Sequence, residues 1–283
     1  MNMADWWQYL PEHIDPVALT IGSLSVRWYA ICFLVGFFAT IGHLLVRSRK
    51  ERHQGFDPGM VWDSAVLTFV GVLVGGRLGY ALVYDPSLFL TPFSLILPLD
   101  PGTGAYSGIH GMSFFGALLG GGIMFFLHIR SRSLDFFTFA DHVAPSIPIA
   151  LFIGRIGNFL NLELPGRTTS LPWGMYFPGP ATGIWELRHP SQLYEALLEG
   201  IVLFFVMVIF RKRNLPKGTM VVVFLGGYAV VRFLVEFFRE PDPGSPIFFG
   251  WMTVGQVLAL LLFVISIFVL TRTDTQATQV RGS

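Results

Sequence analysis

Seven long apolar stretches limit what this chain can fold into. Each has about the 20 residues that an α-helix needs to cross the hydrocarbon core of a bilayer. They use more than half of the 283 residues, so we predict an all-α polytopic membrane protein in which residues 1–283 form a single integral membrane domain. The stretches are Trp28–Val46, Val61–Tyr84, Gly111–Ile129, Phe136–Leu160, Gln192–Phe210, Gly218–Phe238 and Thr253–Leu270.

The distribution of basic residues predicts the orientation. Residues 1–26 and 85–109 contain no Lys or Arg, whereas basic residues follow the first, third and fifth stretches. Because cytoplasmic loops carry the excess of Lys and Arg, the N-terminus should lie outside and the C-terminus inside. Seven transmembrane helices satisfy this arrangement. The loops at about 85–109 and 161–189 then form a small external cap, the second one ordered but without regular helix, and the polar tail 271–283 is cytoplasmic and disordered.

Local features refine the helices. Gly71, Gly75 and Gly79 are spaced by four, which is typical of a face for close helix contact. Pro145 and Pro148 should kink the fourth helix, and a further helix should start at Pro190.

The net charge of +1 gives no reason to expect a nucleic-acid partner. Cysteine and histidine show no metal-ligand spacing, so we expect no metal.

Charged residues interrupt four of the apolar stretches at one depth. An arginine at the centre of a membrane helix costs about 2.5 to 3.5 kcal/mol on insertion scales. With the predicted orientation, Arg77, Arg155, Arg232 and Glu195 all lie in the outer half of the membrane. Spacings of three and four place Tyr228, Arg232, Glu236 and Arg239 on one helix face, and Glu195 and Glu199 on another. The pattern predicts one polar cavity.

Structural alternatives exist for each of these residues. Arg232 and Glu236 can form an ion pair within one helix, Arg77 can reach the outer headgroups, and Glu199 can neutralise a neighbouring arginine. Arg155 can also clamp loop carbonyls. The deeper residues Asp63, Asp141 and His142 are expected to be structural. A cluster of arginines at outer-leaflet depth nevertheless favours an anion that partitions into lipid, and the planar guanidinium suits phosphate oxygens.

The segment GRIGNFLNLELPG at 154–166 resembles the signature of the prolipoprotein diacylglyceryl transferases, G-R-x-G-N-F-(apolar)-N-x-E-x-x-G. Further segments match in the same order: WY at 28–29, GGRLGY at 75–80, GMSF at 111–114, RHPSQLYE at 188–195, GYAVVRFLVEFFREPD at 227–242 and GQ at 255–256. The resemblance implies a multi-pass enzyme of the bacterial inner membrane whose active site faces the periplasm. Such an enzyme moves the diacylglyceryl group of phosphatidylglycerol to the lipobox cysteine in the signal peptide of a preprolipoprotein. A thioether forms, glycerol phosphate is released, and no cofactor is implied.

The resemblance also implies roles for individual residues. Arg155 would bind the lipid phosphate with Asn158 beside it, and Arg232 would stabilise charge on the leaving phosphate. The other matching positions fall into two groups. Those expected in catalysis are Glu163, Glu236, Tyr228 and His189, and those expected in phosphatidylglycerol binding are Tyr29, Arg77, Asn161, Gly166, Glu195 and Arg239.

One position departs from the family pattern. The family commonly has G-M-S-F-H-G where this chain reads GMSFFG, so Phe115 replaces a candidate base. Glu163, Glu236 or His189 can take the thiol proton instead, and His110 is a weaker substitute. Three other functions remain open: a degenerate homologue that binds phospholipid without catalysis, a lipid-binding scaffold, and a lipid transporter.

Overall fold

The computed structural model describes residues 3–22, 24–50, 57–90, 112–213, 215–241 and 245–281. It has two compact units, one formed by Met1–Leu44 with Ala140–Ser283 and the other by Leu45–Phe139. Most of the predicted external loop 85–109, together with His110 and the side chain of Phe115, lies outside what the structure describes. The single membrane domain stays a prediction.

The fold is mainly helical. Ten α-helices occur in the described part of the chain: α1 (Met3–Tyr9), α2 (Trp28–Lys50), α3 (Pro58–Val83), α5 (Phe114–Ser131), α6 (Phe136–Val143), α7 (Ile147–Leu160), α8 (Ser191–Glu195), α9 (Leu203–Arg211), α10 (Thr219–Val235) and α11 (Val254–Arg281). Short 3₁₀ segments are η1 (Leu10–His13), η3 (Pro86–Leu90) and η4 (Ala144–Ser146), and η5 (Ala196–Val202) is a π-helix.

All seven predicted apolar stretches contain helix. Among the described residues, five spans are long and apolar enough to cross a membrane: Trp28–Lys50, Pro58–Val83, Phe136–Leu160, Ser191–Arg211 and Val254–Thr271. The two other apolar helices, Gly116–Ser131 and Thr219–Val235, are shorter. The chain is therefore a helical membrane protein, while seven crossings and the orientation of the termini stay predictions.

Three antiparallel hairpins accompany the helices. They are β1 (Val17–Ile21) with β2 (Leu24–Arg27), β3 (Met175–Pro178) with β4 (Trp185–Arg188), and β5 (Ile247–Phe248) with β6 (Met252–Thr253). The β3–β4 hairpin lies in the loop 161–189, which is ordered and free of helix, as predicted. Its Met175 and Phe177 are fully buried against Phe159, so the loop is built on the end of α7.

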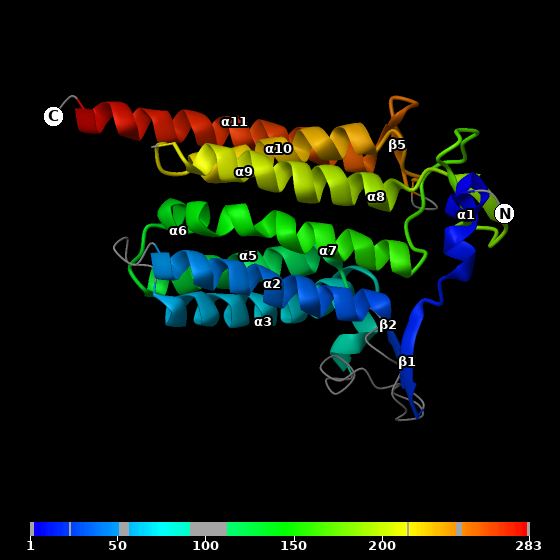
Figure 1. Cartoon of the computed structure of the whole chain (residues 1–283). Helices are drawn as coiled ribbons and strands as arrows, with labels where there is room; N and C mark the ends of the chain where they lie inside the picture. Colours follow the sequence, from blue (N-terminus) through cyan, green and yellow to red (C-terminus); the bar gives the residue numbers. More distant parts are fainter. Residues whose placement is uncertain are drawn as a thin grey trace. The chain divides into compact units, whose positions relative to one another are not determined.

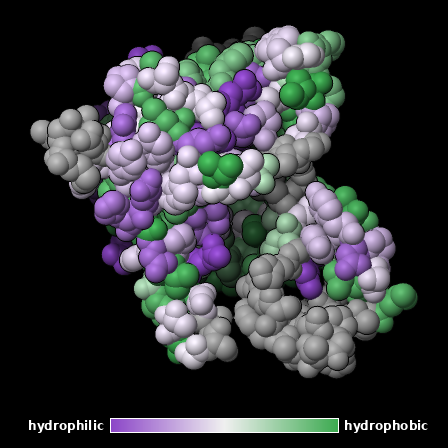
Figure 2. Space-filling model, turned by 90° about the vertical axis from the view of Figure 1, so that its right-hand side faces the viewer, coloured by the Kyte–Doolittle hydropathy of each residue, from purple (hydrophilic) through white to green (hydrophobic). Residues whose placement is uncertain are grey.

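The N-terminal segment packs on the β3–β4 loop. Trp7 Nε1 donates to the Trp173 carbonyl at 2.9 Å, and the rings of Tyr9 and Tyr176 stack 4.6 Å apart. Within its unit, α1 lies at the end of the helices where α7 finishes and α8 begins (Figure 1). Figure 2 looks onto this end, where hydrophilic residues mix with hydrophobic ones. This mixture suits a surface in contact with water.

Proline interrupts the helix over 136–160, as expected. The α-helical hydrogen-bond pattern stops at Val143, passes through η4 around Pro145, and resumes as α7 with Pro148 in its first turn. Proline lacks the donor that an unbroken helix needs. Asp141, just before the break, accepts from the backbone N–H of Gly218 at 2.6 Å and of Val221 at 2.9 Å. It therefore caps α10 and is structural.

The predicted disorder of the tail 271–283 is wrong for most of its length. α11 continues to Arg281, because residues 271–281 contain no Gly or Pro that would end a helix.

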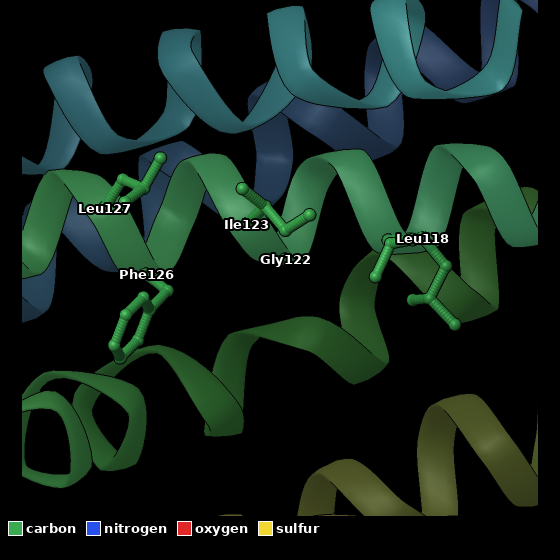
Figure 3. Close-up of a pocket in the computed structure, with 6 residues that line it drawn as sticks. Leu118, Gly122, Ile123, Phe126 and Leu127 are labelled. Atoms are coloured by element: carbon green, nitrogen blue, oxygen red, sulfur yellow. The ribbon is translucent and has the colours of Figure 1, made fainter. Parts of the chain in front are cut away.

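In the unit Leu45–Phe139, the glycine face of α3 packs against α5. A Cβ on Gly71 would lie 2.5 Å from the Gly120 carbonyl, and one on Gly79 would lie 2.7 Å from Gly116 Cα. The predicted close helix contact is confirmed. On α5 itself, Leu118, Ile123, Phe126 and Leu127 line a shallow apolar hollow (Figure 3).

Candidate active site

Six charged side chains form one ion-pair cluster in the unit that contains α7, α8, η5 and α10. Arg155 projects from α7, Glu195 ends α8, and Glu199 lies in η5. Arg232 comes from the last turn of α10, which is followed by Glu236 and Arg239. The glutamates are buried, and the arginine side chains retain only 11 to 17% exposure. The structure thus brings together five residues that the sequence predicted for the site, and Glu199 with them.

Glu195 is the centre of this cluster. Its Oε2 lies 3.1 Å from Arg155 Nε, and its Oε1 accepts from Arg232 Nη1 at 2.6 Å. Arg239 Nη1 approaches the same Oε1 at 3.7 Å. One carboxylate therefore fixes arginines from different parts of the chain, and these guanidinium groups are held close together.

Glu199 is a second partner of Arg155. Its Oε2 accepts from Arg155 Nη2 at 3.2 Å and more weakly from Nε at 3.4 Å. Arg155 Nη1 makes no hydrogen bond with any described residue. Two carboxylates therefore occupy the Nε and Nη2 side of Arg155, and Nη1 is available to an external acceptor.

Glu236 links the cluster to the start of α11. It lies 2.9 Å from Arg232 Nη2 through Oε2, and its Oε1 accepts from the Thr253 hydroxyl at 2.9 Å. Gln256 Oε1 in turn accepts from the Thr253 backbone N–H at 3.0 Å. A Cβ on Gly255 would lie 2.5 Å from Glu236. No role for Thr253 or Gln256 was predicted from the sequence, although the segment GQ at 255–256 matches the family pattern.

The signature continues after α7 as a tight turn. Leu162 and Leu164 have positive φ values of 57° and 55°, an uncommon conformation for residues other than glycine that marks a strained turn. Asn161 donates to Glu163 Oε1 at 3.0 Å and accepts from the Tyr29 backbone N–H at 3.1 Å. The turn therefore places Asn161 and Glu163 beside the start of α2.

The start of α8 holds the strained turn in place. The Gln192 amide donates to the Glu163 carbonyl at 2.6 Å, and the Ser191 hydroxyl donates to the Leu164 carbonyl at 3.0 Å. Both residues are completely buried. Neither was singled out from the sequence beyond its place in RHPSQLYE. Asn158, which lies three residues before Asn161 in the signature, is buried. Its side-chain amide makes no hydrogen bond within the described chain.

Gly166 joins the turn to the segment after α10. Its N–H donates to the His189 carbonyl at 2.9 Å, and it forms a bridge with Arg239. A Cβ here would lie 2.5 Å from the Phe238 carbonyl and 2.6 Å from His189 Cβ. Arg188 donates to the Gly166 carbonyl at 3.0 Å and pairs with Glu240 at 3.3 Å. Close packing, without any positive φ, therefore requires glycine at this position.

His189 lines an aromatic pocket of about 270 Å³. Its Nδ1 is 3.1 Å from the Tyr194 hydroxyl, which accepts from Trp173 Nε1 at 3.0 Å. Partial burial lowers the pKa of His189 below its usual value of 6.5, so the imidazole is neutral at neutral pH. The rest of the pocket is apolar: Leu171, Leu198, Leu234, Val235 and Phe238.

Tyr228 and Arg77 are the remaining predicted residues. Tyr228, from α10, interacts electrostatically with Glu199, Arg232 and Arg155, but forms no hydrogen bond with a described residue. Arg77 lies on α3 in the other unit, so its part in the site stays a prediction. Over the residues that the structure describes, no group of three His, Cys, Asp or Glu could hold a metal ion.

Comparisons with known proteins give the family. The family model for "Prolipoprotein diacylglyceryl transferase" matches residues 16–272. The chain belongs to this family. It is 41% identical over 274 residues to the phosphatidylglycerol–prolipoprotein diacylglyceryl transferase of Chlorobaculum tepidum, covering 95% of this chain and 93% of that protein.

Two further relatives carry the same name. The Nitratidesulfovibrio vulgaris protein is 45% identical over 263 residues, which are 92% of this chain and 94% of that protein. The Vibrio parahaemolyticus protein is 42% identical over 260 residues, which are 91% and 90% of the two chains. The resemblance seen in the signature is therefore confirmed over nearly the whole chain, and membership of this family makes the protein a transferase.

Proposed function

We propose that this prolipoprotein diacylglyceryl transferase family member moves the diacylglyceryl group of phosphatidylglycerol to the lipobox cysteine in the signal peptide of a preprolipoprotein. The thioether forms on the cysteine sulfur, and glycerol phosphate leaves. The enzyme crosses the bacterial inner membrane seven times, and its ion-pair cluster faces the periplasm. It works on lipid and peptide without a cofactor.

One observation carries the proposal: Arg155 and Arg232 are bound to the two oxygens of one carboxylate, at 3.1 and 2.6 Å. A phosphodiester also presents two non-bridging oxygens, which share one negative charge, so guanidinium groups held at that separation can share it. The site is mostly removed from water, where such contacts are stronger than at the surface. A phospholipid reaches it with its headgroup phosphate.

The two arginines have different roles in the reaction. Arg155 holds the phosphate before reaction, because its Nη1 makes no bond with the described chain. Arg232 binds more strongly as charge develops on the leaving phosphate, which is the kind of interaction that accelerates a reaction. The thiolate sulfur attacks the carbon of the diacylglyceryl group that bears the phosphate oxygen. The S–C bond forms, and the C–O bond breaks with its electrons remaining on the oxygen of the departing glycerol phosphate.

The thiol must lose its proton, since a cysteine thiol has a pKa near 8.5. Glu236 is already engaged by Arg232 and by the Thr253 hydroxyl. Glu163 accepts only from Asn161 in the described chain and remains an alternative. His189 suits the role, because it is neutral and its Nε2 accepts a proton when Nδ1 donates to Tyr194.

A direct assay tests the function. The purified protein is mixed with phosphatidylglycerol and a lipobox peptide, and the peptide is analysed by mass spectrometry. We expect the mass of a diacylglyceryl group on the cysteine, and no adduct on a peptide in which serine replaces that cysteine. Phospholipid binding without any adduct would identify a degenerate, non-catalytic homologue.

A further inference from the structure

Glu199 is a buried carboxyl group for which the proposed reaction has no use. Its side chain has no exposure to solvent. Oε2 accepts from Arg155, but Oε1 is buried and has no hydrogen-bond partner in the described chain. Leaving a buried polar atom without a partner destabilises the folded protein, so such an atom beside a binding group requires an explanation.

The backbone is distorted where Glu199 occurs. The helix that begins at Ser191 changes into the π-helix Ala196–Val202 before continuing as α9. Single π turns are rare in proteins, and those that occur often lie at functional sites. Glu195, the last residue of α8, and Glu199, within the π-helix, both contact Arg155.

Close backbone contact fixes this arrangement. A Cβ on Gly200 would lie 2.6 Å from Phe152 Cβ and 2.8 Å from its Cα. The π-helix therefore lies directly against α7, which also carries Arg155. The backbone at Glu199 therefore has little room to move away from Arg155.

The charges of the cluster are already balanced. The three arginines 155, 232 and 239 face the three glutamates 195, 199 and 236. A phosphodiester at Arg155 adds one negative charge beside Glu195 and Glu199. Like charges in a site removed from water repel more strongly than they do at the surface. A ligand of this charge is accommodated at lower cost if one carboxylate takes up a proton.

Glu199 is the carboxylate with the least support. Glu195 contacts three arginines, and Glu236 has Arg232 and the Thr253 hydroxyl, whereas Glu199 has only Arg155. The charged and titratable groups around it are Arg155 on α7, Glu195 on α8, and Tyr228 and Arg232 on α10. α9 carries only Arg211, at its opposite end.

We propose that Glu199 is a positioning residue that takes up one proton when a phosphodiester lipid binds Arg155. The proton sits on Oε1, and Glu199 still accepts from Arg155 through Oε2. The cluster then keeps its net charge, and Arg155 keeps its orientation. This inference rests on the proposed function, because it takes phosphatidylglycerol as the ligand of Arg155.

Calorimetry on the wild-type protein provides the test, in detergent and without peptide, so that no thiol contributes. Phosphatidylglycerol is titrated in buffers of different ionisation enthalpy, and the difference between the observed heats gives the number of protons taken up. We expect about one proton per lipid and, by linkage, a Kd that rises up to about tenfold per pH unit above the pKa of the free carboxyl group. Diacylglycerol, which lacks phosphate, should cause no uptake.

Variants assign the proton to a residue. Glu199→Gln mimics the protonated carboxyl group, so its Kd should not change with pH and its uptake should fall to near zero. Glu199→Asp keeps a titratable group and should restore uptake. The exposed Glu12→Gln removes one carboxylate elsewhere and should behave like the wild type.

The outcomes separate the two proposals. Proton uptake that is absent from the wild type, or unchanged in Glu199→Gln, would overturn the role of Glu199 even if the peptide adduct forms. A protein that neither binds phosphatidylglycerol nor yields an adduct would overturn the proposed function, and this inference with it.

Discussion

Arg155 and Arg232 are bound to opposite oxygens of the same carboxylate, that of Glu195. The arrangement holds two like charges from different helices close together before any ligand arrives. Their mutual repulsion is offset by the glutamate between them, so the site is organised for an anion in advance. Preorganised charge of this kind needs little rearrangement during a reaction.

The first prediction concerns the shape of the Arg155 side chain. Arg155→Lys keeps the positive charge, but a lysine ammonium lacks the planar fork that contacts Glu195 and Glu199 on one side and leaves Nη1 for a phosphate. We expect kcat/KM for adduct formation to fall by about 10²- to 10³-fold. The exposed Arg130→Lys is the matched control and should retain wild-type activity. If Arg155→Lys stays within tenfold of the wild type, the phosphate-binding role is wrong.

The second prediction concerns stability. Glu195→Gln removes the carboxylate that neutralises Arg155 and Arg232 in a buried position. Breaking a buried pair by removing one partner costs about 3 to 5 kcal/mol, and unfolding in detergent should show a loss of this size. Asp63→Asn breaks the exposed pair with Arg132 and should cost at most about 1 kcal/mol. Equal losses in the two variants would contradict a structural role for Glu195.

The sequence predicted the helices and the composition of the cluster because both depend on local spacing. Apolar runs of a given length form helices in lipid, and residues three or four apart share a face. Arg155, Glu195 and Arg232 could therefore be placed at one depth. The choice of partner was not predictable in the same way: the sequence offered Glu236 for Arg232, and the structure adds Glu195 from another helix.

Features that depend on tertiary contacts were missed. The β3–β4 hairpin is stabilised by packing of Met175 and Phe177 on Phe159, and strands of four residues have no reliable pattern of their own. The π-helix at Glu199 likewise depends on the contact between Gly200 and α7. Spacing alone suggested only that Glu199 could neutralise an arginine, which is confirmed, and gave no sign of its unpartnered oxygen.

The third prediction compares the two glycines that bound the signature. Gly166→Ala places a methyl group against the Phe238 carbonyl and His189, and such overpacking costs about 1 to 3 kcal/mol. Phe238 directly precedes Arg239 of the ion-pair cluster, so displacing Phe238 should also displace Arg239. Activity should therefore fall along with stability. Gly154→Ala meets no atom within 4 Å and should stabilise its helix by about 0.5 to 1 kcal/mol. Thermal unfolding and the adduct assay on both variants check this contrast; a tolerated Gly166→Ala would contradict it.

The fourth prediction concerns pH and His189. Burial lowers the pKa of His189 in the folded protein, so the unfolded chain binds the proton first as the pH falls. The contribution of neutral His189 to the free energy of unfolding should therefore be fully present above about pH 6.5. It should be lost as the pH falls from that value through the lower folded-state pKa. Thermal unfolding as a function of pH measures this loss, which should be smaller in His189→Asn.

Activity should follow the same titration if His189 accepts the thiol proton. The neutral imidazole is the reactive form, so kcat/KM in the wild type should fall on the acid side of pH 6.5 with the folded-state pKa of His189. His189→Asn should lose this decline, the acid limb of the pH profile, together with most of the rate. Tyr194→Phe removes the hydroxyl at 3.1 Å from Nδ1 and should lower the rate while keeping the limb. An unaltered acid limb in His189→Asn would leave Glu163 as the base.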